Sequence, residues 1–257
     1  GHLLTSGNYE KKQKHTGGKN GYGSKLANIF SKEFLVETLD SNNGIKYIQR
    51  FYNNMAEKDK PTITKNKGTP YTKITYYPDF ERFGHTKLED DMIKLITKRT
   101  YDAAAVTDSS VNIFLNDIKL EFKSFEKYTD LYLGEKKEIP RIYQEFGSRW
   151  SICVAVNPSQ QFQQVSFVNG ITTYQGGKHV DYITNQICKK IAEYIEKRKK
   201  IKVKSAHIKE NIFVFIRCTI DDPSFNSQIK EFLTTPQSKF GTKCDIDIKF
   251  IEKLAKL

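Results

Sequence analysis

The sequence lacks any apolar run near the length of about 20 residues that crosses a bilayer, and no charged and apolar leader opens it. Its four cysteines are widely spaced and form no C-x-x-C pair, and no histidine cluster has the spacing of a zinc site. We therefore expect a soluble, intracellular protein with no membrane partner. Its cysteines are expected to be buried or free thiols of a reducing compartment.

The composition favours a globular, basic protein. The 257 residues are enough for one large or two modest domains, and 38% of them are hydrophobic. Lysine and arginine number 42 against 30 aspartate and glutamate residues, which gives a formal charge of +12. This balance favours a polyanionic partner such as nucleic acid or nucleotide phosphate, while a lysine-rich surface that is only solvated is the alternative.

Local patterns in the first half predict a loop, a short helix and an antiparallel meander. Residues 1–22 are rich in Gly, Lys and Thr and predict an extended loop, which a helix follows in GYGSKLANIFSKEF. Runs of β-branched and aromatic residues predict strands at FLVETLD, GIKYIQRFY and YTKITYYPD. We expect a helix from about Lys87 to Ala104, then a strand at VNIFLN and a turn at Asn116 and Asp117.

The second half predicts a mixed sheet with one long helix. The polar stretch GEKKEIPRIYQEFGS is the best candidate for a linker, so we place the domain boundary near residues 130–145. RWSICVAV and QQVSFVNGI predict strands, and NIFVFIRCTI predicts a strand that is covered on both faces because it is almost continuously apolar. Apolar residues at three- and four-residue steps predict an amphipathic helix from His179 to about Lys200.

The strongest local signal is TGGKNGYGSKL, where glycines occupy four of seven positions directly before a helical pattern. Glycines let several backbone N–H groups converge on an anion, and a helix N-terminus adds the positive end of its dipole. The order Ser24-Lys25 differs from a Walker A loop, and a dinucleotide fingerprint would need a preceding strand and a third glycine. We interpret the segment as a phosphate-binding loop; a flexible surface loop is the alternative.

GHLLTSGNY followed by TGGKNGYGSKLANIFS resembles the lid and phosphate-binding segment of eukaryotic-type type IIA DNA topoisomerases, within the GHKL (Bergerat) ATPase fold. Later segments are similar to that family in the same order: FYNNM, YTKITYYPDFERF, DLYL, QQVSFVNGITTYQGGKHVDYI and DPSFNSQIKEFLTTPQSKFG. The resemblance implies an α/β protein. Residues 1–135 would be the C-terminal part of a GHKL ATPase domain, an α+β sandwich, and residues 136–257 a smaller α/β transducer domain.

The resemblance also implies the residues that bind ATP. They lie in the lid and the phosphate loop: Ser6, Gly7, Asn8, Gly18, Lys19, Asn20, Gly21, Tyr22, Gly23, Ser24 and Lys25. The family often has a second serine at the position of Gly7, so a backbone contact is expected there. Gln228 and Lys230 match a Gln-Thr-Lys loop of the transducer, with Ile229 in place of Thr. We expect both to bind the nucleotide and to act in catalysis, because the family's lysine reaches the γ-phosphate and its glutamine helps to sense it.

Two further features have a functional and a structural interpretation. Lys197, Arg198 and Lys199, at the end of the long helix, match a stretch that contacts DNA in the family; a solvated helix end is the alternative. His179 has no Ser, Cys or metal-ligand partner at a catalytic spacing, so we expect it to be structural. We assign no residue as a metal ligand.

The resemblance implies the ATP-binding and transducer region of an enzyme that passes one DNA duplex through a transient double-strand break. It would bind nucleotide phosphates and relay the ATP state to the DNA gate. ATP and Mg²⁺ are the implied cofactors and double-stranded DNA the implied partner, with a homodimeric full-length enzyme in the nucleus. A non-catalytic basic nucleic-acid-binding module is one alternative. A mismatch-repair or chaperone-type ATPase is another, but it would not be expected to share the downstream segments.

The chain opens in GHLLTSGNY without an initiator Met, so we expect a fragment. The family's general-base Glu, magnesium-binding Asn and adenine-binding Asp lie upstream of the lid, and its DNA-cleaving Tyr would lie beyond Leu257. We therefore expect that this piece alone neither hydrolyses ATP nor cleaves DNA.

Overall fold

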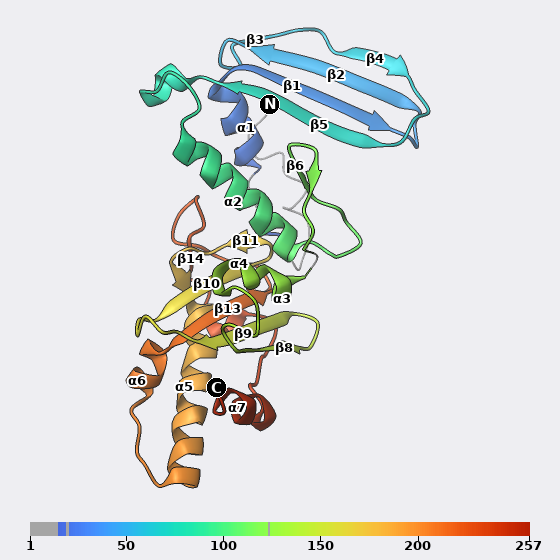
Figure 1. The fold of residues 1–257 in the computed structure, drawn as a ribbon. Helices are drawn as coiled ribbons and strands as arrows, with labels where there is room; N and C mark the ends of the chain where they lie inside the picture. The colour runs from blue at the N-terminus through green and yellow to red at the C-terminus, as the bar shows by residue number, and fades with distance from the viewer. Residues whose placement is uncertain (1–14, 19–20, 123) are drawn as a thin grey trace. The chain divides into compact units, whose positions relative to one another are not determined.

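The computed structural model describes residues 15–18, 21–122 and 124–257. They pack as two compact units, and the chain passes from the first unit to the second between Lys94 and Leu95. His15–Gly17 belong to the second unit. Each unit has its own β-sheet, as Figure 1 shows. No helix in the described part of the chain is long and apolar enough to span a membrane.

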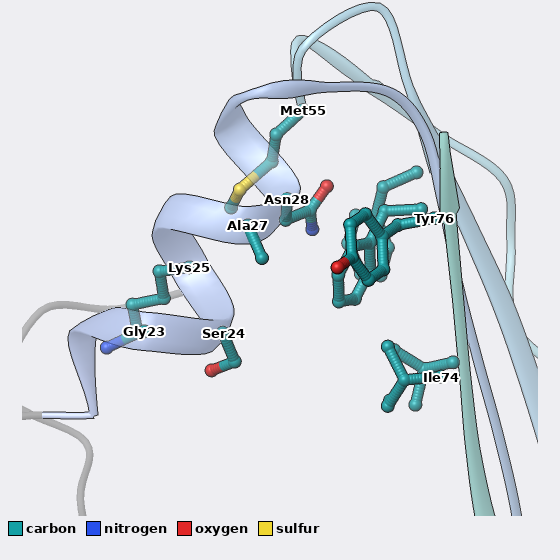
Figure 2. A pocket seen from close by; sticks show the side chains of 11 residues that line it. Gly23, Ser24, Lys25, Ala27, Asn28, Met55, Ile74 and Tyr76 are labelled. Atoms are coloured by element: carbon teal, nitrogen blue, oxygen red, sulfur yellow. The ribbon is translucent and has the colours of Figure 1, made fainter. Parts of the chain in front are cut away.

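The first unit is an antiparallel sheet with a short helix packed on it. The strand order is β3-β2-β1-β5, and β4 also pairs with β2. The predicted Asn-Asn-Gly turn joins β1 to β2, where Gly44 has a φ of 63° and Asp40 accepts a 2.9 Å hydrogen bond from the backbone N–H of Asn42. Figure 2 shows α1 beside the sheet. The elements are α1 (Tyr22–Ile29), β1 (Ser31–Asp40), β2 (Ile45–Tyr52), β3 (Glu57–Lys58), β4 (Thr62–Lys65), β5 (Tyr71–Pro78) and η1 (Phe80–Phe83).

The helix α2 (Asp90–Val106) spans the point where the chain enters the second unit. There the order β11-β10-β13-β9-β8 forms a mixed sheet, in which β13 runs parallel to β10 and antiparallel to β9. The strands are β6 (Phe114–Leu115), β7 (Ile118–Lys119), β8 (Arg141–Phe146), β9 (Trp150–Val156), β10 (Gln163–Val168), β11 (Ile171–Thr172), β12 (Gly176–Gly177), β13 (Ile212–Cys218) and β14 (Phe232–Leu233). The helices are α3 (Phe125–Tyr128), α4 (Asp130–Leu133), α5 (Lys178–Lys199), α6 (Ser205–Glu210), η2 (Gln237–Lys239) and α7 (Ile248–Leu254).

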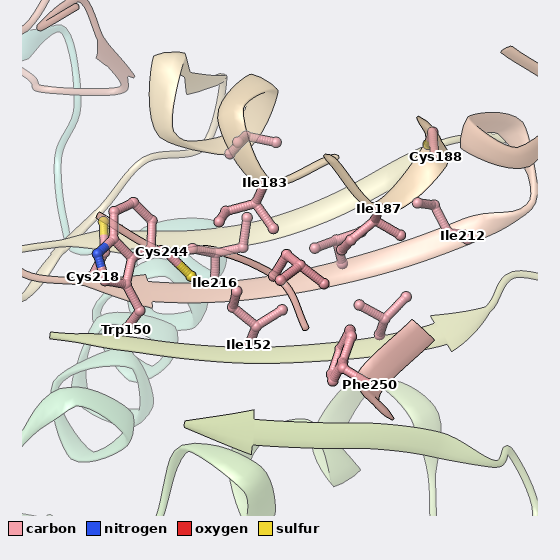
Figure 3. Packing of buried hydrophobic residues seen from close by; sticks show 14 of the residues in the cluster. Trp150, Ile152, Ile183, Ile187, Cys188, Ile212, Ile216, Cys218, Cys244 and Phe250 are labelled. Carbon is pink, nitrogen blue, oxygen red and sulfur yellow. The ribbon is translucent and has the colours of Figure 1, made fainter. Parts of the chain in front are cut away.

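Both faces of the second sheet are covered. Along β13, Val214 and Ile216 belong to a core that α5 and α7 complete, and the alternating Phe213 and Phe215 belong to a second core built with α3 and α4. Figure 3 shows Ile183 and Ile187 of α5 facing the strands in the first of these cores. The prediction of a strand buried on both faces is therefore confirmed, and the α/β class with it.

Most of the longer predicted elements are confirmed, but the predicted linker is wrong. Within residues 134–148 the structure has the strand β8, and Arg141 at its start is only 2% exposed. The guanidinium of Arg141 donates to the backbone oxygen of Gly134 at 2.8 Å and is paired with Asp130. The carboxylate of Asp130, 11 positions earlier in the chain, neutralises this buried charge, and local composition does not reveal that pairing.

The two compact units divide elsewhere than the predicted domain boundary at 135/136. Residues 125–133, which that prediction assigns to the first domain, pack against the second sheet through Phe125, Tyr128 and Leu133. The boundary stays a prediction. The prediction of buried or free thiols is confirmed, because all four cysteines are both, and burial raises the pKa of Cys188 to about 11; the reducing compartment stays a prediction.

Candidate functional site

The described part of the predicted phosphate loop surrounds the start of α1. Gly18, Gly21, Tyr22, Gly23, Ser24 and Lys25 are described, whereas Ser6, Gly7, Asn8, Lys19 and Asn20 lie outside the described residues. Gly21 is the N-cap residue of α1, with φ 66° and ψ 22°. A left-handed backbone at this position favours glycine, because a Cβ would make it strained. The glycine pattern therefore sets how the chain enters the helix.

The N-terminus of α1 has the features of an anion site. Among the described residues no side chain caps it, and its first turn carries no acidic residue. The first N–H groups of a helix have no partner within the helix, and the positive end of its dipole lies there. A Cβ built on Gly23 meets no heavy atom of the described residues within 4 Å, so among them the backbone is open to close approach by a ligand at this point. These features fit the phosphates of a nucleotide.

A pocket of about 590 Å³ lies between α1 and the sheet of the first unit. It is bounded at one end by Gly23, Ser24 and Lys25, and its walls are mostly apolar. Figure 2 shows Ala27 and Asn28 on the side of α1 that faces Tyr76. Asn28 is only 7% exposed, and its Oδ1 atom has no hydrogen-bond partner among the described residues. The pocket therefore joins the helix N-terminus to an apolar cavity with one buried amide.

Gln228 and Lys230 lie in one tight turn of the second unit. The backbone N–H of Lys230 donates to the oxygen of Ser227 at 3.2 Å, and Lys230 has a φ of 66°. Gln228 and Ile229 are exposed, and Lys230 is half-buried. A lysine in the left-handed region is uncommon and costs about 1 kcal/mol or more, so the residues around it must hold this backbone.

Two short strands support the turn that carries Gln228 and Lys230. β14 follows it and pairs in parallel with β12, with Gly177 opposite Leu233. On the other side, Phe225 forms a bridge with Leu233, and the N–H of Asn226 donates to Phe232 at 3.1 Å. We name residues 224–231 the sensor loop, after the role that the resemblance predicts for Gln228. The sequence did not predict these supporting residues; the only signal was the glycine pair in GGKH.

The basic run Lys197, Arg198 and Lys199 forms the last turn of α5, and all three residues are exposed. The Arg198 guanidinium lies 3.8 Å from Glu252 and 5.6 Å from the ring centre of Tyr194. Lys200, with a φ of 59°, ends the helix. The prediction of a basic helix end is confirmed, and DNA contact stays a prediction.

His179 lies in the first turn of α5 and has no exposure. Its Nε2 atom lies 3.2 Å from the hydroxyl of Thr173, which is in turn 2.6 Å from the hydroxyl of Ser166. Burial lowers the pKa of His179 to about 3, so the ring is neutral near pH 7. Buried and neutral, His179 holds the start of α5, as expected for a structural residue.

The predicted residues form three groups in the structure. The phosphate loop belongs to the first unit, while the sensor loop and the basic run belong to the second. That the phosphate loop and Lys230 act on one nucleotide stays a prediction. In residues 15–18, 21–122 and 124–257, no three or more His, Cys, Asp or Glu side chains are grouped to hold a metal ion.

Comparison with known proteins gives matches over the whole chain. The family model described as DNA gyrase B matches residues 90–256. DNA topoisomerase 2 of Arabidopsis thaliana is 46% identical over 265 residues, covering 100% of the chain and 18% of that protein. DNA topoisomerase 2 of Saccharomyces cerevisiae is also 46% identical, over 275 residues, covering 100% of the chain and 19% of that protein. The chain thus spans about a fifth of the length of these curated relatives.

Solved structures also match the whole of this chain. The ATPase region of Saccharomyces cerevisiae topoisomerase II superposes with a TM-score of 0.91 at 46% identity, covering 100% of the chain and 66% of that structure. The ATPase and transducer domains of DNA topoisomerase II from Balamuthia mandrillaris give a TM-score of 0.92 at 39% identity, with coverage of 100% and 66%. The described elements are therefore those of a fold found in experiment.

Proposed function

Because the chain belongs to the DNA gyrase B family, within the group of the topoisomerase II ATPase regions, we propose that it is the nucleotide-binding and transducer part of a type II DNA topoisomerase. In this function, ATP binding and hydrolysis drive the passage of one DNA duplex through a break in another. The observation that supports it most is the left-handed Gly21 at a helix N-terminus that no described side chain caps, within a chain that is 46% identical over its whole length to DNA topoisomerase 2 of Arabidopsis thaliana. That geometry suits a polyphosphate.

Each candidate group has a role in this proposal. The backbone of the phosphate loop, with Lys19, Asn20 and Lys25, binds the phosphates of ATP. Ser6, Gly7 and Asn8 contribute from the lid. Lys230 places its ammonium group on the terminal phosphate, where it stabilises negative charge, and Gln228 senses whether that phosphate is present. When the phosphate leaves, Lys230 loses its partner, so the second unit responds to hydrolysis.

The long helix α5 leads to the basic run from β12, which pairs with the strand that follows the sensor loop. It begins at Lys178, next to β12, and its 22 residues rise about 33 Å to Lys199. We propose that Lys197, Arg198 and Lys199 contact DNA phosphates there. The further parts of the proposal are a homodimeric full-length enzyme, a nuclear location, and Mg²⁺ as the ion that accompanies ATP, with no ligand assigned in this chain.

The test of nucleotide binding is calorimetric titration with a non-hydrolysable ATP analogue and magnesium. It compares this chain with the same chain extended upstream to a complete ATPase region, each as wild type and as Lys25→Ala. We expect the extended wild type to bind and Lys25→Ala to weaken binding about tenfold or more, since a charge-assisted contact is lost. Lys32→Ala, which removes a lysine of β1 paired with Glu81, is the matched control and should bind as wild type does.

The alternative function is a basic nucleic-acid-binding module, which the charge of +12 supports. It predicts salt-dependent DNA affinity and no binding of the nucleotide analogue, even by the extended chain. The same titration separates the two, because absence of binding in the extended wild type would overturn the ATP-dependent function and leave the module.

A further inference from the structure

Gly177 makes a backbone contact with Leu233 that no other residue could make. A Cβ built on Gly177 would lie 2.5 Å from both the backbone nitrogen and the backbone oxygen of Leu233. Gly177 also has a φ of 135° and a ψ of −167°, a region that is essentially closed to residues with a Cβ. Both residues are buried, and they are paired in register between β12 and β14. The glycine is therefore required by the approach of the two strands.

This contact lies close to the sensor loop in the chain. Only Glu231 and Phe232 separate Lys230 from Leu233 in the chain. Glu231 is held by Gln175, whose backbone N–H donates to the Glu231 backbone oxygen at 3.0 Å and whose side chain donates to the Glu231 carboxylate at 2.9 Å. The backbone of Lys230 is thus fixed through its neighbour, at a residue that already has an unfavourable φ of 66°.

We infer that Gly177 and Gln175 are positioning residues that set where the ammonium group of Lys230 lies. The inference rests on the proposed function of Lys230. Reaction rates depend steeply on such placement, since a displacement of about 1 Å in a catalytic group can lower a rate about a hundredfold. A Cβ at residue 177 would push β14 away from β12, and the sensor loop would move with β14.

The test is steady-state ATP hydrolysis by the full-length protein with Gly177→Ala, Lys230→Ala and the double variant. We expect Gly177→Ala to lower kcat at least about tenfold with KM within about threefold of wild type, because the displaced group acts on the bound nucleotide. The double variant should be no slower than Lys230→Ala alone, since both changes remove the same interaction. Multiplied effects in the double variant would overturn the inference, because they would make Gly177 act independently of Lys230.

The control is Gly147→Ala, at a glycine of the same unit whose φ is also positive, at 62°, but whose Cβ would meet nothing within 4 Å. It places a Cβ at a positive φ without the collision and should leave kcat within about twofold of wild type. An equal fall of kcat in Gly147→Ala and Gly177→Ala would contradict positioning by the strand contact. If Lys230→Ala itself leaves kcat unchanged, the proposed function of Lys230 fails, which is a different result.

Gln175→Ala keeps the measurement informative if Gly177→Ala does not fold. Gln175 is exposed, so removing its side chain should leave folding intact while it releases the Glu231 carboxylate. We expect a fall in kcat of about threefold to tenfold, absent when Lys230 is already alanine. A kcat unchanged from wild type in Gln175→Ala would remove Gln175 from the inference. If Gly177→Ala also fails to fold, the unchanged kcat of Gln175→Ala would overturn the inference as a whole.

Discussion

The hydroxyl oxygen of Tyr128 lies 2.6 Å from Oδ1 of Asp102 and donates a hydrogen bond to it. Asp102 is 3% exposed, and it also accepts from Lys98 Nζ at 2.8 Å and from the Thr172 hydroxyl at 2.9 Å. Burial raises the pKa of Tyr128, and so does the hydrogen bond to Asp102, so the tyrosine stays a donor. The carboxylate of Asp102 thereby joins α2, α3 and β11 in the second unit.

Asp102→Ala should lower the free energy of unfolding by about 3–5 kcal/mol, because it leaves the buried donors without their acceptor. Urea unfolding followed by circular dichroism measures this loss. The matched control is Asp91→Ala, on the same helix, whose side chain is 94% exposed and pairs with Lys94 at 3.0 Å. Its effect should stay below about 1 kcal/mol. An equal loss of unfolding free energy in both variants would mean that the buried hydrogen bonds of Asp102 do not stabilise the fold more than an exposed ion pair does.

The sequence predicts the long elements of the fold because their burial leaves a local pattern. β13 is apolar throughout since both its faces are covered, and α5 repeats its apolar residues with helical spacing. The strand β8 escaped prediction because its segment is rich in Lys and Glu, and the burial of Arg141 depends on Asp130 and Gly134. β12 and β14 have only two residues each and exist because distant segments pair.

The same distinction separates the predicted and the unpredicted parts of the site. The phosphate loop is visible in the sequence, since its glycines meet a local backbone requirement that Gly21 displays. Gln228 and Lys230 have no such local signature and were identified only by resemblance. The support that Gly177 and Gln175 give to the sensor loop is a tertiary contact, which no local pattern encodes.

His179 should make the stability of the second unit pH-dependent. Burial lowers its folded-state pKa to about 3 from an ordinary value of 6.5, so between these values the unfolded state binds more protons than the folded state. Stability therefore rises with pH through this window and is fully present above it. From pH 7 to pH 5, His179 should cost about 2 kcal/mol of the free energy of unfolding.

The comparison of wild type with His179→Gln isolates this titration from all others. The variant removes the titrating group, so the difference in unfolding free energy between the two proteins should change by about 2 kcal/mol between pH 7 and pH 5. Urea unfolding at both pH values measures it. The same difference at pH 5 and pH 7 would show that the ring takes up its proton in the folded protein as readily as in the unfolded one.

The basic run should contribute to DNA affinity through phosphate contacts. Lys197→Ala, Arg198→Ala and Lys199→Ala combined should reduce the slope of log affinity against log salt by about 3, because each phosphate contact releases about one counterion. Titration of duplex DNA at several salt concentrations measures the slope. The control combines Lys58→Ala, Lys60→Ala and Lys65→Ala, three exposed residues of the first unit, and removes the same charge. Equal effects of the two triple variants would leave only the net charge as the cause.

Asp221 should affect nucleotide binding although it lies outside the phosphate loop. Its Oδ1 atom is 2.8 Å from Nε2 of His15 and accepts from Arg149 at 2.9 Å. His15 precedes the phosphate loop closely in the chain, and Gly17 lies so near Ile171 that a Cβ would be 1.8 Å from its Cδ1 atom. These contacts fix the segment that leads into the loop, and ordering each residue of a loop costs about 1–2 kcal/mol.

Asp221→Asn keeps the shape of this side chain but removes the charge that both basic partners face. The segment before the phosphate loop would then be less ordered in the free protein, and part of the free energy of binding would be used to order it. The extended chain should therefore bind the ATP analogue about threefold to tenfold more weakly. Asp222→Asn, at the neighbouring residue, is the control, because Asp222 is exposed and its substitution removes the same charge. Calorimetry measures both affinities. If the two variants bind alike, the segment before the phosphate loop is held by packing at Gly17 and not by the ion pairs of Asp221.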